Sequence, residues 1–143
     1  MLADLPHLRV LMLGNNKITD ISVLEQLLEL EYLELYGNRI PDLSPLASLP
    51  LLTDLNVANT HLRNIEPVKK LTSLKRIWFS LNNLSASQNR EIMAALPDTV
   101  CNYAAKTATG GGWQDDERYP WACSFFLPPA EQEGTEPVEP VSD

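Results

Sequence analysis

The chain has 143 residues, of which 44% are hydrophobic and 21% are charged. This composition supplies enough apolar side chains for a core, so a wholly disordered chain is excluded. Eleven basic residues against 19 acidic residues give a net charge of −8, which argues against a nucleic-acid partner bound through its phosphates. No apolar run of about 18 residues is present, so the sequence predicts no membrane span.

A repeat of 22 residues runs through the first two thirds of the chain. At least five columns of apolar residues keep this step without an insertion, and one of them contains Leu11, Leu33, Leu55 and Ile77. A constant period of this length is typical of stacked repeats, in which each unit buries its apolar face against its neighbour.

Each repeat begins with an L-x-L segment, which is followed by an Asn in three of the repeats, at Asn16, Asn38 and Asn82. The alternation predicts a short strand with one buried face. An amide side chain both donates and accepts, so we expect a ladder of Asn residues to satisfy the buried backbone groups of successive turns. Thr60 occupies this position in the third repeat, and we expect a local irregularity there.

The second half of each repeat is too short for a long helix and predicts a 3₁₀ turn or a one-turn helix. Ser44-Pro45 and Glu66-Pro67 place a proline where the first helical residue is expected. Asp20, Asp42 and Asn64 lie just upstream, where a side-chain oxygen can accept a hydrogen bond from a free backbone N–H.

Residues 33–46, with the sequence LELYGNRIPDLSPL, resemble a leucine-rich repeat of the 22-residue class. This class occurs in internalin-like bacterial surface proteins and in the phosphatase regulator of the SDS22 type, and the resemblance covers residues 2 to about 96. It implies an α/β fold, a right-handed solenoid with short parallel strands on the concave face, 3₁₀ or short helical turns on the convex face, and a C-terminal cap. It also implies a binding role without catalysis and without a cofactor.

The first repeat is incomplete, because Leu2 occupies the place of Leu24. No signal peptide is recognisable around Asp4, which leaves a cytoplasmic location open, or export as part of a longer surface protein. No polar capping element precedes Leu5, although terminal repeats need a polar outer face. We therefore expect a fragment of a longer solenoid, or an N-terminal edge that a partner covers, including self-association through this uncapped edge.

Residues 87–96 predict a helix with Ser87 as its N-cap, and Pro97 ends it. A fifth and final strand is expected next, with Thr99 and Cys101 at its inward positions. The repeats therefore occupy residues 1–96.

Residues 97–127 are expected to form a C-terminal cap whose glycine-rich loop allows a sharp turn. The aromatic residues expected to seal the core are Trp113, Tyr119, Trp121, Phe125 and Phe126. Residues 128–143 contain five acidic residues, no basic residue and four prolines, which is typical of a disordered acidic tail or linker.

The sequence gives little support for catalysis or for a metal site. The histidines His7 and His61 lie in different repeats, and neither is expected near Cys101 or Cys123. The acidic residues 115–117 lack the spacing of a calcium-binding loop. We therefore predict no enzyme activity and no metal, and the two cysteines are either free thiols or, in an exported protein, a disulfide.

Residues between the core leucines of each strand point to the opposite, concave side. In stacked repeats they form columns with a spacing of about 4.8 Å. The first column is Val10, Tyr32, Asp54 and Arg76, the second is Met12, Glu34, Asn56, Trp78 and, as an extension, Val100, and the third is Gly14, Tyr36, Ala58 and Ser80.

These columns are rich in residue types that are enriched at protein interfaces. We therefore predict that the concave face binds a protein or peptide segment through Tyr32, Glu34, Tyr36, Asp54, Asn56, Arg76 and Trp78. Asp54 is expected to lie beside Arg76. Two alternatives stay open: aromatic residues that only pack across strands, and a structural spacer without binding of its own within a multidomain surface protein.

Overall fold

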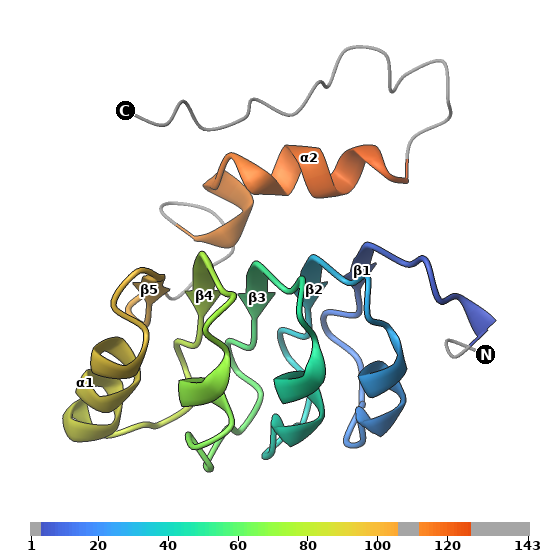
Figure 1. Cartoon of the computed structure of the whole chain (residues 1–143). Helices are drawn as coiled ribbons and strands as arrows, with labels where there is room; N and C mark the ends of the chain where they lie inside the picture. Colours follow the sequence, from blue (N-terminus) through green and yellow to red (C-terminus); the bar gives the residue numbers. More distant parts are fainter. Residues whose placement is uncertain (1–3, 106–111, 127–143) are drawn as a thin grey trace. The chain divides into compact units, whose positions relative to one another are not determined.

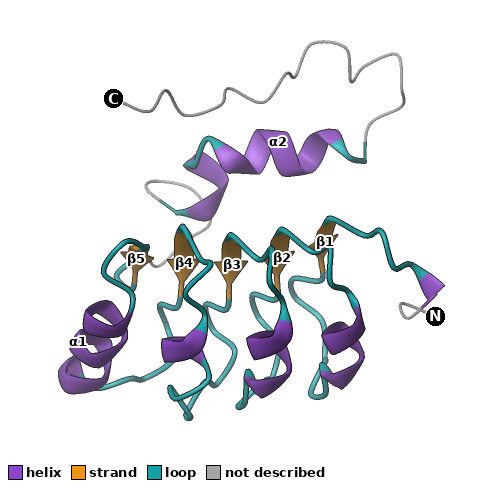
Figure 2. Cartoon of the chain, viewed as in Figure 1, coloured by secondary structure: helices purple, strands orange, loops and turns teal. Residues whose placement is uncertain are grey.

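The computed structural model describes residues 4–105 and 112–126. The chain divides into two compact units, Met1–Lys106 and Thr107–Asp143, which are described separately below. In the first unit, strands lie on one side of the repeats and short helices lie on the other (Figures 1 and 2).

The sheet of the first unit is parallel, and its strands follow one another in chain order. The strands are β1 (Val10–Met12), β2 (Tyr32–Glu34), β3 (Asp54–Asn56), β4 (Arg76–Trp78) and β5 (Val100–Asn102). Leu11, Leu33, Leu55 and Ile77 pair in register, which confirms the 22-residue step. Five parallel strands that alternate with 3₁₀ turns and short helices confirm the predicted α/β fold.

The placement of Val100 in the second column is wrong. Val100 pairs with Arg76, and Asn102 pairs with Trp78. The fourth repeat contains the helix α1 (Ala86–Ala95) where the earlier repeats have a 3₁₀ turn. Its connection is therefore longer by two residues, and Val100 continues the first column.

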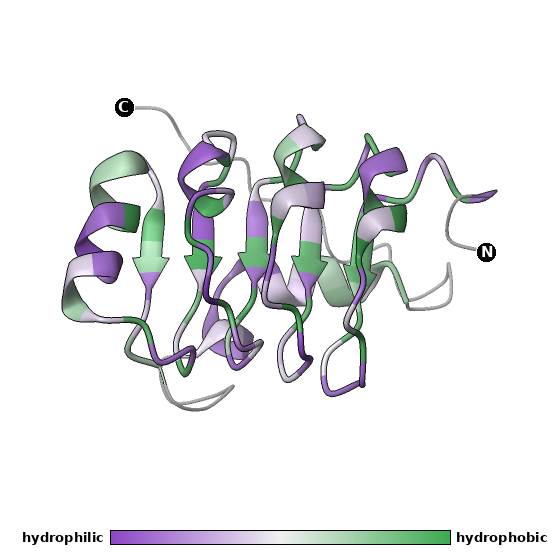
Figure 3. Cartoon of the chain, turned by 90° about the horizontal axis from the view of Figure 1, so that it is seen from below, coloured by the Kyte–Doolittle hydropathy of each residue, from purple (hydrophilic) through white to green (hydrophobic). Residues whose placement is uncertain are grey.

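The core of the first unit lies between the strands and the helical turns. The central residues Leu33, Leu55 and Ile77 are fully buried, and Cys101 packs against the same cluster from β5. Figure 3 shows both hydrophobic and hydrophilic residues within β2, β3 and β4, as expected where only one side of a strand faces the core. The inward position of Cys101 is confirmed.

Asn38 joins two successive repeats through its amide group. The N–H of Ile18 donates to Asn38 Oδ1 at 3.0 Å. Asn38 Nδ2 donates to the carbonyl oxygens of Leu13 and Leu35, both at 2.8 Å. One buried side chain therefore satisfies backbone groups of its own turn and of the preceding turn, which is the ladder that the sequence predicts.

Asn82 repeats this arrangement two turns later. Its Oδ1 accepts from the N–H groups of Thr60 and Leu62 at 2.9 and 3.1 Å. Its Nδ2 donates to the carbonyls of Val57 and Phe79 at 2.8 and 3.0 Å. Asn82 is 6% exposed, so water does not readily replace these partners.

The turn at Thr60 departs from this pattern, as expected. Thr60 Oγ1 donates to the carbonyl of Val57 at 2.8 Å, which reproduces one bond of an Asn. The N–H of Ile40 donates instead to the backbone carbonyl of Thr60 at 2.7 Å, and the next residue, His61, has a left-handed backbone with φ 62°. A backbone carbonyl thus takes the place of the missing side-chain acceptor.

Among the described residues, five residues other than glycine have a left-handed backbone. Three of them occupy the same position in their repeats as Gly37 does in its own. The φ angles there are 56° for Asn15, 69° for Gly37, 52° for Asn59 and 60° for Leu81. Glycine and asparagine tolerate this conformation, whereas a Cβ-bearing apolar residue is strained in it. Leu81 is also 48% exposed, so packing gives it little compensation.

The helical turns of the first three repeats are η2 (Ser22–Gln26), η3 (Ser44–Ser48) and η4 (Val68–Lys70). Each begins with the predicted side-chain hydrogen bond, from the N–H of Ser22 to Asp20, of Ser44 to Asp42 and of Glu66 to Asn64. The backbone N–H of Ser22 lowers the pKa of the Asp20 carboxyl. Pro45 lies in the first turn of η3 as predicted, whereas Pro67 directly precedes η4.

The N-cap of α1 is Ser85, so the prediction of Ser87 is wrong. The N–H of Gln88 donates to Ser85 Oγ at 3.2 Å, and the N–H of Ser85 donates to Gln88 Oε1 at 2.9 Å. This reciprocal capping box requires a Gln or Glu three residues after the cap, and Gln88 meets that requirement only for Ser85.

The second unit contains η5 (Trp113–Asp115) and α2 (Arg118–Ser124). Trp113 is 3% exposed, whereas Phe126 is 62% exposed. The Arg118 guanidinium lies 3.7 Å from the centre of the Trp121 ring. That residues 97–127 cap the repeats stays a prediction, and the expected acidic tail, 128–143, lies outside the described residues. Within the described residues, no helix has the length and apolar character needed to cross a bilayer.

We expect Asn82→Ala to destabilise the repeats by at least about 3 kcal/mol, because several buried backbone groups lose their partners. Asn16→Ala is the matched control, since Asn16 holds the same repeat position but is exposed. Among the described residues its side chain bonds only to the carbonyls of Leu13 and Gly14. Urea denaturation of both variants measures the difference. Equal losses of stability would contradict the inter-repeat role of Asn82.

We expect Leu81→Asn to stabilise the chain by about 0.5 to 1 kcal/mol, because asparagine adopts the left-handed conformation at lower cost. Leu51→Asn is the control, because Leu51 is also 48% exposed but is not among the residues with positive φ. Midpoints of urea unfolding measure both effects. An equal change in the two variants would show that lost hydrophobicity, and not backbone strain, decides the result.

Candidate functional site

The concave face, defined as the side chains of β1–β5 and of Tyr36 and Ser80 that point away from the leucine core, contains the predicted site. The pairing of the strands places Tyr32 beside Asp54 and Asp54 beside Arg76. In the next column Glu34 lies beside Asn56, which lies beside Trp78. Six of the seven predicted site residues therefore come from β2, β3 and β4, and Tyr36 lies two residues after the end of β2.

These side chains are less exposed than the alternation along the strands predicts. Tyr32, Asp54, Asn56 and Trp78 are between 1% and 3% exposed, and the other three predicted residues are half-buried. The polar atoms among them therefore need hydrogen-bond partners, because a buried polar group without one is costly.

Asp54 has such partners. Arg76 Nη1 lies 3.4 Å from Asp54 Oδ1, and Thr53 Oγ1 donates to Asp54 Oδ2 at 2.8 Å. The expected pairing of Asp54 and Arg76 is confirmed. Since Asp54 is buried and Arg76 is 18% exposed, solvent screens this pair less than a surface ion pair.

Two donors of the face lack partners within the described residues. The N–H of Ala58 donates to Asn56 Oδ1 at 3.0 Å, but Asn56 Nδ2 has no hydrogen-bond partner. Ser80 Oγ also has none, and Ser80 is 3% exposed. These two atoms are therefore buried polar groups whose capacity to donate is unused within the described residues.

Ser80 is the residue that the predicted site omits. It lies in the third column after Gly14, Tyr36 and Ala58, so the sequence shows a single small hydroxyl residue there. Only the burial of its Oγ without a partner distinguishes it from an ordinary turn serine.

The residues considered for catalysis do not converge. His7 Nδ1 lies 2.7 Å from Glu29 Oε1 on the surface, and His61 belongs to another repeat. Cys101 and Cys123 are free thiols, and burial raises the pKa of the Cys101 thiol, which makes it a weaker nucleophile at neutral pH. Within the described residues, no cluster of three or more His, Cys, Asp or Glu side chains could hold a metal ion.

A family model for leucine-rich repeats, which describes two copies of the repeat, matches residues 6–48 and 29–70. No match appears among curated protein sequences. The part of the sequence that matches the family model is therefore the repeat itself. In the structure this segment forms β1–β3 and η2–η4.

Solved structures resemble the chain over a longer stretch. Internalin C2 from Listeria monocytogenes is 29% identical with a TM-score of 0.61, covering 69% of this chain and 43% of that chain. A second internalin from this species is 29% identical with a TM-score of 0.57, covering 65% and 28%. A leucine-rich repeat protein from Leptospira interrogans is 23% identical with a TM-score of 0.56, covering 71% and 33%. The chain thus spans less than half the length of each.

We expect a double-mutant cycle on Asp54→Asn and Arg76→Gln to give a coupling energy of about 1 to 3 kcal/mol, because the carboxylate is buried. The matched control is Glu66 and Lys69, whose side chains lie 2.7 Å apart on the surface. Urea unfolding of the single and double variants measures both cycles. A coupling for the surface pair as large as that for Asp54 and Arg76 would contradict the importance of burial.

Proposed function

We propose, because the chain is a leucine-rich repeat protein, that it is a protein-interaction module whose concave face binds a protein or peptide segment. Domains built from leucine-rich repeats are commonly protein-interaction modules and typically carry no catalytic site. The proposal extends this general role to a particular surface and to particular residues of this chain.

The observation that carries the proposal is a pair of buried donors, Asn56 Nδ2 and Ser80 Oγ, for which the described part of the chain offers no acceptor. Each such donor costs about 1 to 3 kcal/mol while it stays unsatisfied. The backbone carbonyls of an extended segment are acceptors of suitable size, and their binding would recover this energy. If the face bound its partner through apolar contacts alone, the two buried donors would have no role in binding.

The aromatic residues around these donors support the same function. Trp78 follows Asn56 in its column, and Tyr36 is half-buried in the column of Ser80. Tryptophan and tyrosine contribute a large share of binding energy at protein interfaces because they bury much area with few rotatable bonds. They would hold the side chains of the segment, while the donors would hold its backbone.

The dimensions of the face favour a short partner segment. Five strands with a spacing of about 4.8 Å span about 19 Å, which matches five or six extended residues at about 3.3 Å each. This surface is small compared with a standard interface of about 800 Å² per partner. We therefore infer a loop or a peptide as the bound element.

A structural spacer is the competing function, and the Asp54–Arg76 pair favours it. In that case the polar residues of the face would serve only to neutralise each other, as these two do. The two functions differ in what they require of Ser80, since a spacer does not need its hydroxyl group.

The test uses peptides that are selected on the full chain from a displayed random library. We expect these peptides to shift the amide resonances of β2–β4, and Ser80→Ala to weaken their affinity about tenfold. The same variant keeps or raises the free energy of unfolding, because it removes a buried donor that has no partner. Titration followed by NMR, together with urea unfolding, measures both quantities.

Ser87→Ala, at an exposed position of α1, is the control and should leave the affinity unchanged. Selected peptides that bind Ser80→Ala as tightly as the unaltered chain would contradict the proposal. So would peptides that shift only amides outside the strands, or a library that yields no binder.

A further inference from the structure

A second surface, separate from the concave face, is a hollow at the side of the repeats. It has a volume of about 300 Å³, and its lining residues are Thr19, Arg39, Pro41, His61 and Arg63. These residues belong to the segments that connect the strands to the helical turns. We call this hollow, with these five residues, the lateral groove.

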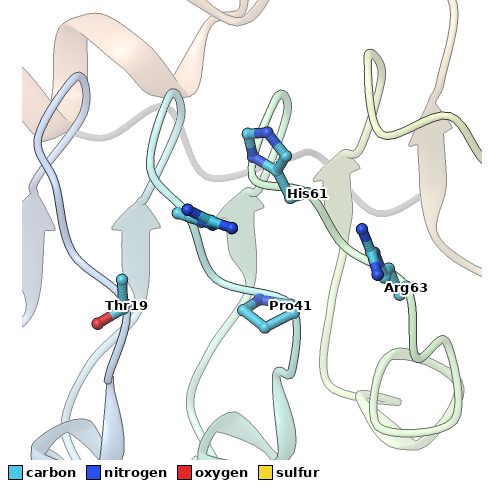
Figure 4. A pocket seen from close by; sticks show the side chains of 5 residues that line it. Thr19, Pro41, His61 and Arg63 are labelled. Atoms are coloured by element: carbon cyan, nitrogen blue, oxygen red, sulfur yellow. The ribbon is translucent and has the colours of Figure 1, made fainter.

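The repeat itself builds the lateral groove. Arg39 and His61 each directly follow the residue at the Asn position of their repeat, which is Asn38 or Thr60. Thr19, Pro41 and Arg63 each lie three residues after that Asn position. Figure 4 shows Thr19, Pro41 and Arg63 at one level on successive repeats, with His61 nearer to the end of its strand. The groove therefore runs across the repeats, perpendicular to the strands.

The guanidinium groups of the lateral groove are not neutralised within the described residues. Arg39 and Arg63 are exposed, and the ion pairs of the described residues include neither of them. In contrast, Arg9 binds Glu31 at 2.6 Å and Arg76 binds Asp54. Two arginines that form no ion pair within the described residues thus line one hollow of a chain whose net charge is −8.

The acidic residues next to the groove bind backbone groups and not the arginines of the groove. Asp20 and Asp42 directly follow lining residues, but their carboxylates accept hydrogen bonds from the N–H groups of Ser22 and Ser44. These bonds complete the turns before η2 and η3. The carboxylates thus flank the groove without binding its arginines.

We propose that the lateral groove binds an acidic peptide segment, in extended form, through the side chains of Arg39 and Arg63. A guanidinium group binds a carboxylate by two parallel hydrogen bonds. Adjacent repeats lie about 4.8 Å apart, and side chains on one face of an extended peptide lie about 6.6 Å apart. The long arginine stems span this difference, so alternate acidic residues of one peptide can reach successive repeats.

The form and charge of the groove favour a peptide over other anions. Its two arginines come from successive repeats, and Pro41 lines the same hollow, whereas a single phosphate is best held by donors that converge. A nucleic acid releases many counterions when it binds and needs a broad positive surface, which disagrees with the charge of this chain. Pro41 and Thr19 offer apolar contacts to other parts of the peptide.

The test is the affinity of the full chain for a fluorescent peptide of alternating Glu and Ser. We expect binding that weakens with salt and that shifts the amide resonances of residues 17–19, 39–41 and 61–63. The double variant Arg39→Ala/Arg63→Ala should weaken binding at least about tenfold, because it removes both charge-assisted contacts. The backbone N–H of Arg39 and of Arg63 keeps its partner in this variant, so we expect it to fold.

The control variant is Lys70→Ala/Arg90→Ala, which changes the net charge equally at exposed positions of η4 and α1. It should keep its affinity, and a peptide of alternating Gln and Ser should not bind. Equal losses in the two double variants would overturn the proposal, because they would indicate attraction by overall charge. Displacement of the acidic peptide by an equal concentration of inorganic phosphate would overturn it as well.

Discussion

The stacking of the repeats depends on hydrogen bonds that cross from one turn to the next. A turn in every repeat leaves backbone groups that point into the interior, where water cannot satisfy them. Asn38 and Asn82 bind backbone groups of two turns at once. A shift of one repeat against the next would break these bonds and also uncover the leucine column, so polar and apolar interactions specify the same register.

This register creates both surfaces of the first unit. Because equivalent residues stand side by side, the side chains at one repeat position form a line on the surface, and those at nearby positions of successive repeats come close together. On the strand side this produces the column of Glu34, Asn56 and Trp78. Beside the ladder it brings Arg39 and Arg63 to one hollow. The two surfaces differ in chemistry, since the first contains buried donors and aromatic rings and the second contains exposed guanidinium groups.

The concave face combines groups that are satisfied with groups that are not. Asp54 is held by Arg76 and by Thr53, which supports the sheet itself. Asn56 Nδ2 and Ser80 Oγ have no partner within the described residues. Replacing Ser80 with alanine would remove a buried donor that has no partner among the described residues, so the fold itself does not require the hydroxyl group. The proposed binding role would give this hydroxyl group a partner.

The sequence by itself determined the repeat, the parallel sheet, the Asn ladder and the irregularity at Thr60, because these follow from local spacing and from the need to satisfy every turn. The repeat period also predicted correctly which site residues of β2, β3 and β4 lie side by side. The cap at Ser85 also follows from local sequence, because Gln88 stands three residues after it, although the prediction placed the cap at Ser87. The tertiary structure decided the position of Val100 after the longer fourth repeat and the burial of Tyr32 and Trp78. Only the tertiary structure revealed that Ser80 Oγ is buried without a partner among the described residues, and that a groove lies at Arg39. Burial and hydrogen-bond partners depend on residues that are far apart in the chain.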